Sequence, residues 1–292
     1  MDIVLIIINS IIASAIYGWI ALGFNLIYGV TKFFNLAHGA MVVISGYAFL
    51  WFSRMPDADL FYSVFASVAI AGFIGWLVDR FIYCPLRKKK ASNMVFLVSS
   101  LGVLVAIQSL AAIVFTNQFR LLGLDMEILP TIQIYDYRIT EIQLVIITTM
   151  LLIAFGLGIF LRHTLFGKAV RAINDDEEVA KMVGIDTERI IGQVFFVGSA
   201  IAGLAGILIG FDTGIDPAMG MGLLFKGVVA SVIGGVGNVY GGVVGAFMLG
   251  FIENFGIWKL SSEWKDAIAF MVLIIIMIFR PQGIFNKDAL RQ

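Results

Sequence analysis

The chain has 292 residues, of which 60% carry hydrophobic side chains and 14% are charged, and its mean hydropathy is +0.97. This composition lies far outside that of soluble globular domains and predicts a membrane protein with several spans. Twenty basic and twenty acidic residues leave no net charge, so nothing indicates a nucleic-acid partner. Because the apolar runs are continuous and about 20 residues long, we expect helices and not the alternating strands of a β-barrel.

The first three apolar runs cover residues 3–29, 33–52 and 60–83. The first lacks a basic leader, so we expect it to be retained as a span. Asn35, His38 and Gly39 interrupt the second run. The third ends at the strongest basic cluster of the chain, residues 87–90. By the positive-inside rule, this cluster places its loop in the cytoplasm.

The next spans are expected at residues 91–116 and 142–161, joined by a polar connector, 117–141, outside the cell. The second of these spans returns to the cytoplasm and is followed by a charge-dense segment, residues 162–189. Charged groups cannot remain in hydrocarbon, where each costs about 2.5–3.5 kcal/mol at the bilayer centre. Both basic regions are therefore predicted on the cytoplasmic side of one membrane.

Residues 190–211 form the following span and carry small residues every four positions, at Gly198, Ala202, Gly206 and Gly210. Such a stripe predicts a helix face that packs closely against other helices.

Residues 219–253 are apolar but interrupted by Lys226 and by glycine pairs around Asn238. We expect two half-length segments that meet near Asn238, since broken helices are tolerated at membrane depth when they are buried or line a polar cavity. A last apolar run, 267–279, places the C-terminus in the cytoplasm. Eight or nine hydrophobic segments result, and an odd number of full crossings would place the N-terminus outside.

The predicted fold is all-α: a single domain, residues 1–292, built as a polytopic transmembrane helix bundle with broken, glycine-rich helices. Segment 162–189 is predicted to hold a short helix with Asn174 as N-cap, Glu177 as its capping-box partner and Gly184 at the C-terminal end. Its apolar side chains form a stripe too short to fold alone. We therefore expect the helix to dock on a partner, although an amphipathic surface helix between two spans is the alternative.

Three stretches of sequence carry a family resemblance. They are GKAVRAINDDEEVAKMVGIDTER (residues 167–189), the N-x-A-H-G box (35–39) and KGVVASVIGGVGNVYGGVVGAFMLGFIE (226–253). Taken in chain order, from 35–39 through 167–189 to 226–253, they resemble permeases of ABC importers, specifically the branched-chain amino acid (LivH-type) group. The resemblance implies a transport subunit in a bacterial or archaeal plasma membrane, and neither an enzyme nor a cofactor-binding protein.

The same resemblance implies partners: a second permease chain, two cytoplasmic ATP-binding subunits and an extracytoplasmic solute-binding protein. It assigns segment 162–189 as the coupling loop, with the contact to the ATPase in its helix, residues 174–187. The candidate coupling residues are Gly167, Arg171, Glu177, Glu178, Ala180, Met182, Gly184 and Ile185. The solute is expected to be a branched-chain or other hydrophobic amino acid, with urea or a short amide as the rival.

Polar residues within the apolar runs are candidates for the translocation path: Asn25, Asn35, His38, Gly39, Lys226 and Asn238. Ordinary structural roles compete with this reading. His38 could simply hydrogen-bond a neighbouring helix, and Lys226 could extend toward the outer surface near Asp212 and Asp216. Glu253, at a span end, is expected to be solvated.

No catalytic or metal site is predicted. Gly167-Lys168 is followed by alanine and lacks the glycine of a phosphate-binding loop, so the chain cannot bind ATP by that route. The other functional class left open is a secondary transporter or channel that needs no ATPase. It would explain the apolar spans but leaves the helix of segment 162–189 without a role.

Overall fold

Long apolar helices account for most of the chain, as a computed structural model shows for residues 3–56, 59–122, 131–134, 137–258 and 260–285. Within these residues, six helices are long and apolar enough to cross a membrane. They are α1 (Ile3–Thr31), the continuous stretch Leu60–Lys88, α5 (Asn93–Phe115), α6 (Glu141–His163), α9 (Thr187–Asp212) and α11 (Val239–Gly256). The expected fold class, an all-α multi-pass membrane bundle, is confirmed.

The remaining helices are shorter. Stretch Leu60–Lys88 consists of α3 (Leu60–Val78), a π-helical turn η1 (Asp79–Tyr83) and α4 (Cys84–Lys88). Three further apolar helices are α2 (His38–Phe52), α10 (Met219–Gly234) and α12 (Lys265–Phe279), the last preceded by a 3₁₀ turn, η2 (Ser262–Trp264). The predicted coupling loop forms α7 (Leu165–Asp175) and α8 (Glu177–Met182).

A β-hairpin was not expected in the polar connector. Strands β1 (Thr131–Ile134) and β2 (Tyr137–Thr140) pair antiparallel, with Thr131 opposite Thr140. The hairpin leads directly into α6, whose first turn is closed by a capping box in which Gln143 reaches back to the Thr140 amide.

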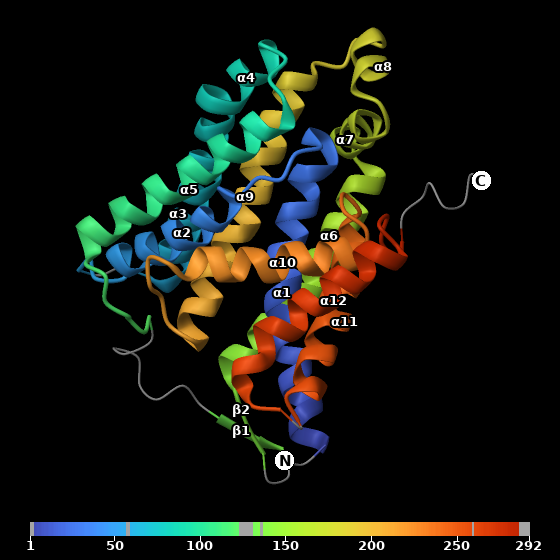
Figure 1. Ribbon diagram of the computed structural model, residues 1–292. Helices are drawn as coiled ribbons and strands as arrows, with labels where there is room; N and C mark the ends of the chain where they lie inside the picture. The colour runs from blue at the N-terminus through green and yellow to red at the C-terminus, as the bar shows by residue number, and fades with distance from the viewer. Residues whose placement is uncertain (1–2, 57–58, 123–130, 135–136, 259, 286–292) are drawn as a thin grey trace.

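Helix α1 runs through the centre of the bundle (Figure 1). Its residues from Ser10 to Val30 are almost all buried, because α6, α9, α10 and α11 surround it. Trp19 is fully buried and its indole N–H donates to the Ile146 carbonyl of α6 at 3.2 Å. This surrounding explains why α1 is apolar on all sides, because each of its faces packs against another helix.

The small-residue stripe of α9 packs as predicted. A Cβ atom at Gly198 would lie 2.8 Å from the Ile27 side chain of α1, and one at Gly206 would collide with the Val42 backbone of α2. Gly198, Ala202, Gly206 and Gly210 are all buried. Close approach of backbones is the means by which helices in lipid gain packing energy.

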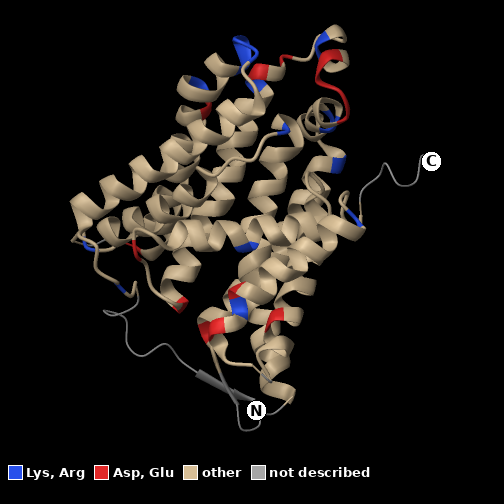
Figure 2. Ribbon diagram, in the orientation of Figure 1, with Lys and Arg blue, Asp and Glu red and all other residues tan. Residues whose placement is uncertain are grey.

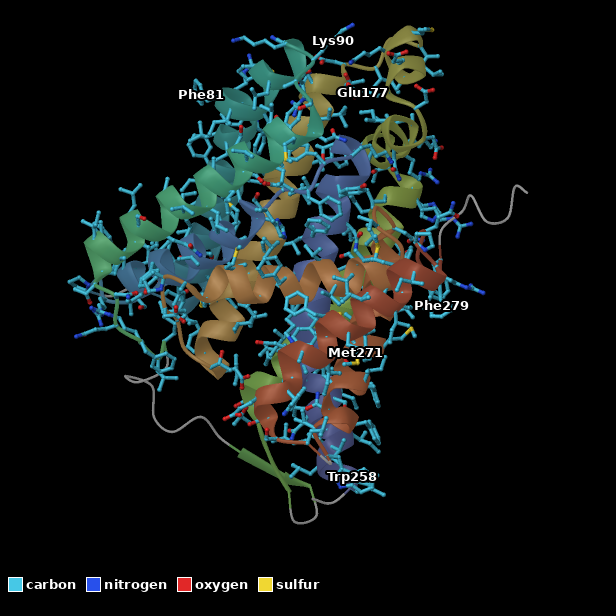
Figure 3. All side chains as sticks on the ribbon, viewed as in Figure 1. Phe81, Lys90, Glu177, Trp258, Met271 and Phe279 are labelled. Carbon is cyan, nitrogen blue, oxygen red and sulfur yellow. The ribbon has the colours of Figure 1, made fainter. Side chains whose placement is uncertain are left out.

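Charged side chains concentrate toward the two ends of the bundle, and α4, α7 and α8 share one of these ends (Figures 1 and 2). Figure 3 shows Lys90 and Glu177 at this end and Trp258 at the other. We call it the α4/α8 end. The structure therefore brings together the two charged loops that the sequence places on one membrane side.

Candidate functional site

The predicted coupling loop forms two helices where the sequence predicted one. Asn174 lies in the last turn of α7 and accepts a hydrogen bond from Lys32 Nζ at 2.5 Å, so its prediction as N-cap was wrong. The N-cap of α8 is Asp176, whose Oδ1 accepts from the Glu178 and Val179 amides at 2.8 and 3.0 Å. Helix α7 extends through Asn174 because Leu165–Asp175 is itself an amphipathic helix with Val170 and Ile173 buried.

Glu177 also differs from its predicted role. Its carboxylate pairs with Lys181 at 2.6 Å, one turn along α8, and accepts from Thr187 Oγ1 of α9 at 3.5 Å. Since Asp176 already caps the helix, no capping box with Asn174 forms. Glu177 instead joins α8 to the start of α9.

The C-terminal end of α8 is as predicted. Gly184 has φ +87°, a left-handed conformation that side chains disfavour. Its amide donates to the Lys181 carbonyl at 3.0 Å, and the Ile185 amide donates to the Ala180 carbonyl at 3.1 Å. This pair of bonds is the Schellman motif. Helix α8 is therefore fixed at both ends, although it has only six residues.

Helix α8 presents an apolar surface to its surroundings. Ala180 is buried against the bundle, whereas Val179, Met182 and Val183 are 53%, 81% and 71% exposed. Large apolar side chains exposed at a charged end of a membrane protein indicate an interaction site. Of the other candidate coupling residues, Glu178 is exposed beside this surface and Ile185 is half-buried, whereas Gly167 is buried against Leu161. Arg171 lies elsewhere, in a cavity.

Behind α8, one arginine connects three elements. Arg87 of α4 donates to both carboxylate oxygens of Asp79 in η1, at 2.7 and 3.3 Å, and to Glu188 of α9 at 2.8 Å. Glu188 follows Thr187, which contacts Glu177 of α8. Sequence reasoning did not identify this cluster, although an aspartate and an arginine eight residues apart at the end of a span were a signal for it.

A cavity of about 940 Å³ opens between α1, α6, α7 and the loop that joins α10 to α11. Two of the predicted path residues, Asn25 and Asn238, line it, as does Arg171. The sequence analysis missed its other charged residues, Lys32, Arg162 and Asp175. Three cationic side chains and one carboxylate give this cavity a positive character.

Asn25 and Asn238 hold the helix break that the sequence predicted. Asn25 donates to Ser231 Oγ at 2.9 Å and accepts from the Gly237 amide at 2.8 Å. Asn238 is the N-cap of α11 and accepts from the Gly241 amide at 3.1 Å. Gly235 and Gly237 have φ +111° and +84°, which explains the glycines around the break. Two helices thus meet at Asn238, as expected. Only α10 is short, however, because α11 is itself long enough to cross a membrane, so the expectation that both segments are half-length was wrong for α11.

The other early candidates lie outside this cavity. Asn35 accepts from the Ala37 amide at 3.1 Å and from Tyr83 Oη at 2.9 Å. Gly39 packs against the Gly220 backbone of α10. His38 is 1% exposed, and neither ring nitrogen makes a hydrogen bond of normal geometry to the part of the chain that the structure describes. The ring nevertheless interacts with the backbone of Ile20 in the neighbouring helix α1, outside normal hydrogen-bond geometry, which agrees with a structural contact between helices.

Lys226 lies in an ionic cluster around the buried Glu253 and does not extend toward Asp212 and Asp216. Its Nζ is 2.6 Å from Glu253 Oε1 and 2.8 Å from Asp266 Oδ1. Tyr17 Oη donates to the second oxygen of Glu253 at 2.6 Å. Glu253 is fully buried, so the expectation that it is solvated was also wrong. Both expectations failed for the same reason. Helices α1, α10 and α11 pack around the Glu253 carboxylate, which excludes water from it and places it within reach of the Lys226 ammonium group.

Comparison with known proteins covers almost the whole chain. Residues 6–277 match the family described as "Branched-chain amino acid transport system / permease component". The high-affinity branched-chain amino acid transport system permease protein LivH of Salmonella typhimurium is 30% identical, over 96% of this chain and 94% of the relative. The corresponding permease protein BraD of Pseudomonas aeruginosa is 28% identical, over 96% and 94%.

A probable branched-chain amino acid transport permease protein LivH from the archaeon Methanocaldococcus jannaschii is 26% identical, over 96% of this chain and 91% of the relative. No solved structure shows a significant match. The length of the family match and the 30% identity over nearly complete chains lead to one conclusion. The chain is a multi-pass membrane protein that belongs to the branched-chain amino acid transport system permease family.

Proposed function

We propose that this chain is the membrane subunit of an ATP-driven importer for branched-chain or other hydrophobic amino acids, and that α8 is the element through which a separate ATPase drives it. The observation that carries the proposal is the exposed surface of α8, formed by Val179, Met182 and Val183. A self-contained secondary transporter or channel has no use for a capped helix that holds three apolar side chains in water. A groove on a partner protein would bury them.

Movement of α8 has a direct route into the bundle. Glu177 contacts Thr187 at the start of α9, and the next residue, Glu188, is bonded to Arg87. Arg87 in turn holds Asp79 in the π-helical turn at the end of α3. We infer that ATP binding and hydrolysis in the partner shift α8, and that α9 and α3 follow. Such a shift requires the ATPase to contact α8 differently in its two states.

The cavity between α1, α6 and α7 suits the inner end of the path for an amino acid. Lys32, Arg162 and Arg171 provide positive charge for a carboxylate. The first turn of α11 begins at Asn238 in the cavity wall, and helix N-termini at breaks favour the same group. Urea and short amides carry no carboxylate, so they would gain nothing from these charges. This supports an amino acid over the rival solutes.

The complete transporter would contain a second permease chain, two cytoplasmic ATPase subunits and an extracytoplasmic solute-binding protein. In a bacterial or archaeal plasma membrane, the α4/α8 end and the C-terminus would face the cytoplasm. The support for this orientation is the basic cluster at residues 87–90, which lies at the same end of the bundle as α8.

Substitution Met182→Asp tests the docking surface without disturbing the caps of α8. Met182 is 81% exposed, so a charge there is tolerated by the folded chain but not by an apolar groove. We expect co-purification of the ATPase to fall about tenfold or more, as for a central interface residue. Lys89→Asp, at the same end of the bundle but off α8, is the control and should retain the ATPase.

Uptake into vesicles then separates the functional classes. The reconstituted complex should accumulate labelled leucine with ATP, far more than labelled urea, and Met182→Asp should abolish accumulation. Uptake driven by an ion gradient without ATP would refute the proposal. So would a Met182→Asp variant that binds the ATPase and transports normally.

A further inference from the structure

A second concave surface lies on the side of the bundle, apart from the cavity at α1. It is an apolar groove of about 610 Å³ between α3, the junction of α6 and α7, and α9. Five aromatic rings line it: Phe73 and Trp76 from α3, Phe160 and Phe166 from α6 and α7, and Phe196 from α9. Four of them, all except Phe166, are between 37% and 52% exposed. An apolar groove of this kind at membrane depth must be filled by some apolar group.

The single polar residue in the wall of the groove is Gln193 of α9. It belongs to an exposed stripe with Arg189 one turn before it and Phe196 one turn after it, at positions i, i+4 and i+7. Along α9 toward the α4/α8 end, the exposed side chains therefore change from an aromatic ring (Phe196) to an amide (Gln193) and then to a cation (Arg189). Arg189 is about 6 Å along the helix axis from Gln193.

The wall formed by α3 and the π-helical turn η1 that continues it shows the same change. Phe73, Trp76 and Arg80 lie at positions i, i+3 and i+7 and are all exposed. Among the residues that the structure describes, the guanidinium groups of Arg80 and Arg189 make no salt bridge or hydrogen bond, although Arg80 interacts electrostatically with Asp79 at longer range. The carboxylates nearest to them in sequence, Asp79 and Glu188, are occupied by Arg87.

Along this side of the bundle, two arginines without a salt bridge to the described residues are followed by an amide and then by an aromatic groove. This is the order of groups in a phospholipid. A phosphate is an anion that arginine binds well, a glycerol ester accepts hydrogen bonds from an amide, and an acyl chain fills an apolar groove. A second protein chain in the groove would have to bring its own carboxylates to both arginines. The membrane provides the anion without that requirement.

We propose that the groove binds one acyl chain of an anionic phospholipid, whose phosphate contacts Arg80 and Arg189 and whose ester accepts from Gln193. The site joins α3 to α9 next to the Arg87 cluster. A lipid bound there would hold these two helices together at the α4/α8 end.

Quenching of tryptophan fluorescence by brominated lipid tests the site, because Trp76 lies in the groove. The complete complex is reconstituted with phosphatidylglycerol or phosphatidylcholine carrying dibrominated chains. The chain has five tryptophans, so the difference between wild type and Trp76→Phe isolates the signal of Trp76. We expect this signal to be quenched at several-fold lower mole fraction by the phosphatidylglycerol than by the phosphatidylcholine.

Charge variants test the assignment of the phosphate. The double variant R80Q/R189Q should lose the preference for phosphatidylglycerol. The control K89Q/K90Q removes two exposed cations from the same end of the bundle and should keep it. Two results with the wild-type protein would overturn the proposal: equal quenching by both lipids, which indicates only the general lipid shell, or no quenching of Trp76, which indicates that a second protein chain fills the groove. Neither result depends on whether the arginine variants fold.

Discussion

Arg87 and Glu188 form an ion pair at 2.8 Å that joins α4 to the first turn of α9, although 101 residues separate them in the chain. The same guanidinium holds Asp79, whose side chain is only 3% exposed. The arginine therefore has two different tasks. One is to neutralise a buried carboxylate in the π-helical turn, and the other is to connect that turn to the element that follows α8.

Two substitutions should separate these tasks. Arg87→Gln leaves Asp79 buried without its cation, and we expect a loss of stability of about 3–5 kcal/mol. Glu188→Gln removes a partner that is 29% exposed, so stability should fall by about 1 kcal/mol or less. Thermal unfolding of the purified protein in detergent provides the measurement. Under the proposed function, Glu188→Gln should also lower solute uptake per ATP hydrolysed while the ATPase stays bound.

An equal, small effect of both substitutions would show that Asp79 is not dependent on Arg87. The double variant R87Q/D79N is the matched control. Because it removes both buried charges, it should recover part of the stability that Arg87→Gln loses.

The sequence predicted the parts of the fold that depend on local pattern. The glycines around Asn238 marked the break, where Gly235 and Gly237 have positive φ angles, and the small residues of α9 marked its packing face. The N-cap was assigned to Asn174 and not to Asp176, because both are good caps and only the packing of α7 decides which one is free.

Side-chain pairs between elements that are distant in sequence could not be predicted from the sequence, for a different reason. Lys226 and Glu253 lie on separate helices, and their pairing depends on how α10 and α11 turn at the break. The cavity likewise draws its cations from the residue after α1, from α6 and from α7, so its charge became visible only when these helices were placed together. Local sequence contains no information on which faces of separate helices meet.

Lys226 pairs with two carboxylates, the buried Glu253 and the exposed Asp266, and the two pairs should differ in their contribution to stability. Lys226→Met leaves the fully buried carboxylate of Glu253 with Tyr17 as its one remaining side-chain partner among the described residues, and we expect a loss of about 3–5 kcal/mol. Asp266→Asn removes the other partner of Lys226, which is 77% exposed, and should change stability by about 1 kcal/mol or less. Chemical denaturation of both variants under the same conditions gives the comparison. Similar losses from both would mean that Glu253 does not depend on its lysine.

Adding one methyl group at Gly206 of α9 tests how closely α9 packs on α2. In Gly206→Ala, the new Cβ collides with the Val42 backbone, which cannot rotate away as a side chain can. We expect a loss of about 1–3 kcal/mol, the usual cost of overpacking a core. Gly102→Ala in α5 meets no atom within 4 Å and should stabilise its helix slightly, by about 0.5–1 kcal/mol. Melting temperatures that move in the same direction for both would contradict the packing described.

A substitution at the C-terminal end of α8 tests whether the ATPase requires a preformed α8 helix or only its exposed side chains. Gly184 has φ +87°, and an alanine in that conformation costs about 1–2 kcal/mol. A Cβ at Gly184 touches nothing within 4 Å, so Gly184→Ala should fray α8 without affecting the bundle. Hydrogen exchange should become faster at the amides of Gly184 and Ile185, whose bonds close the helix, while the melting temperature stays unchanged. Gly222→Ala, in α10 and equally free of contacts, is the control with an ordinary helical backbone.

If α8 must be preformed to be bound, affinity for the ATPase should fall by up to about tenfold in Gly184→Ala alone, since 1.4 kcal/mol corresponds to a factor of ten. Faster exchange with unchanged affinity would instead mean that the partner folds α8 as it binds.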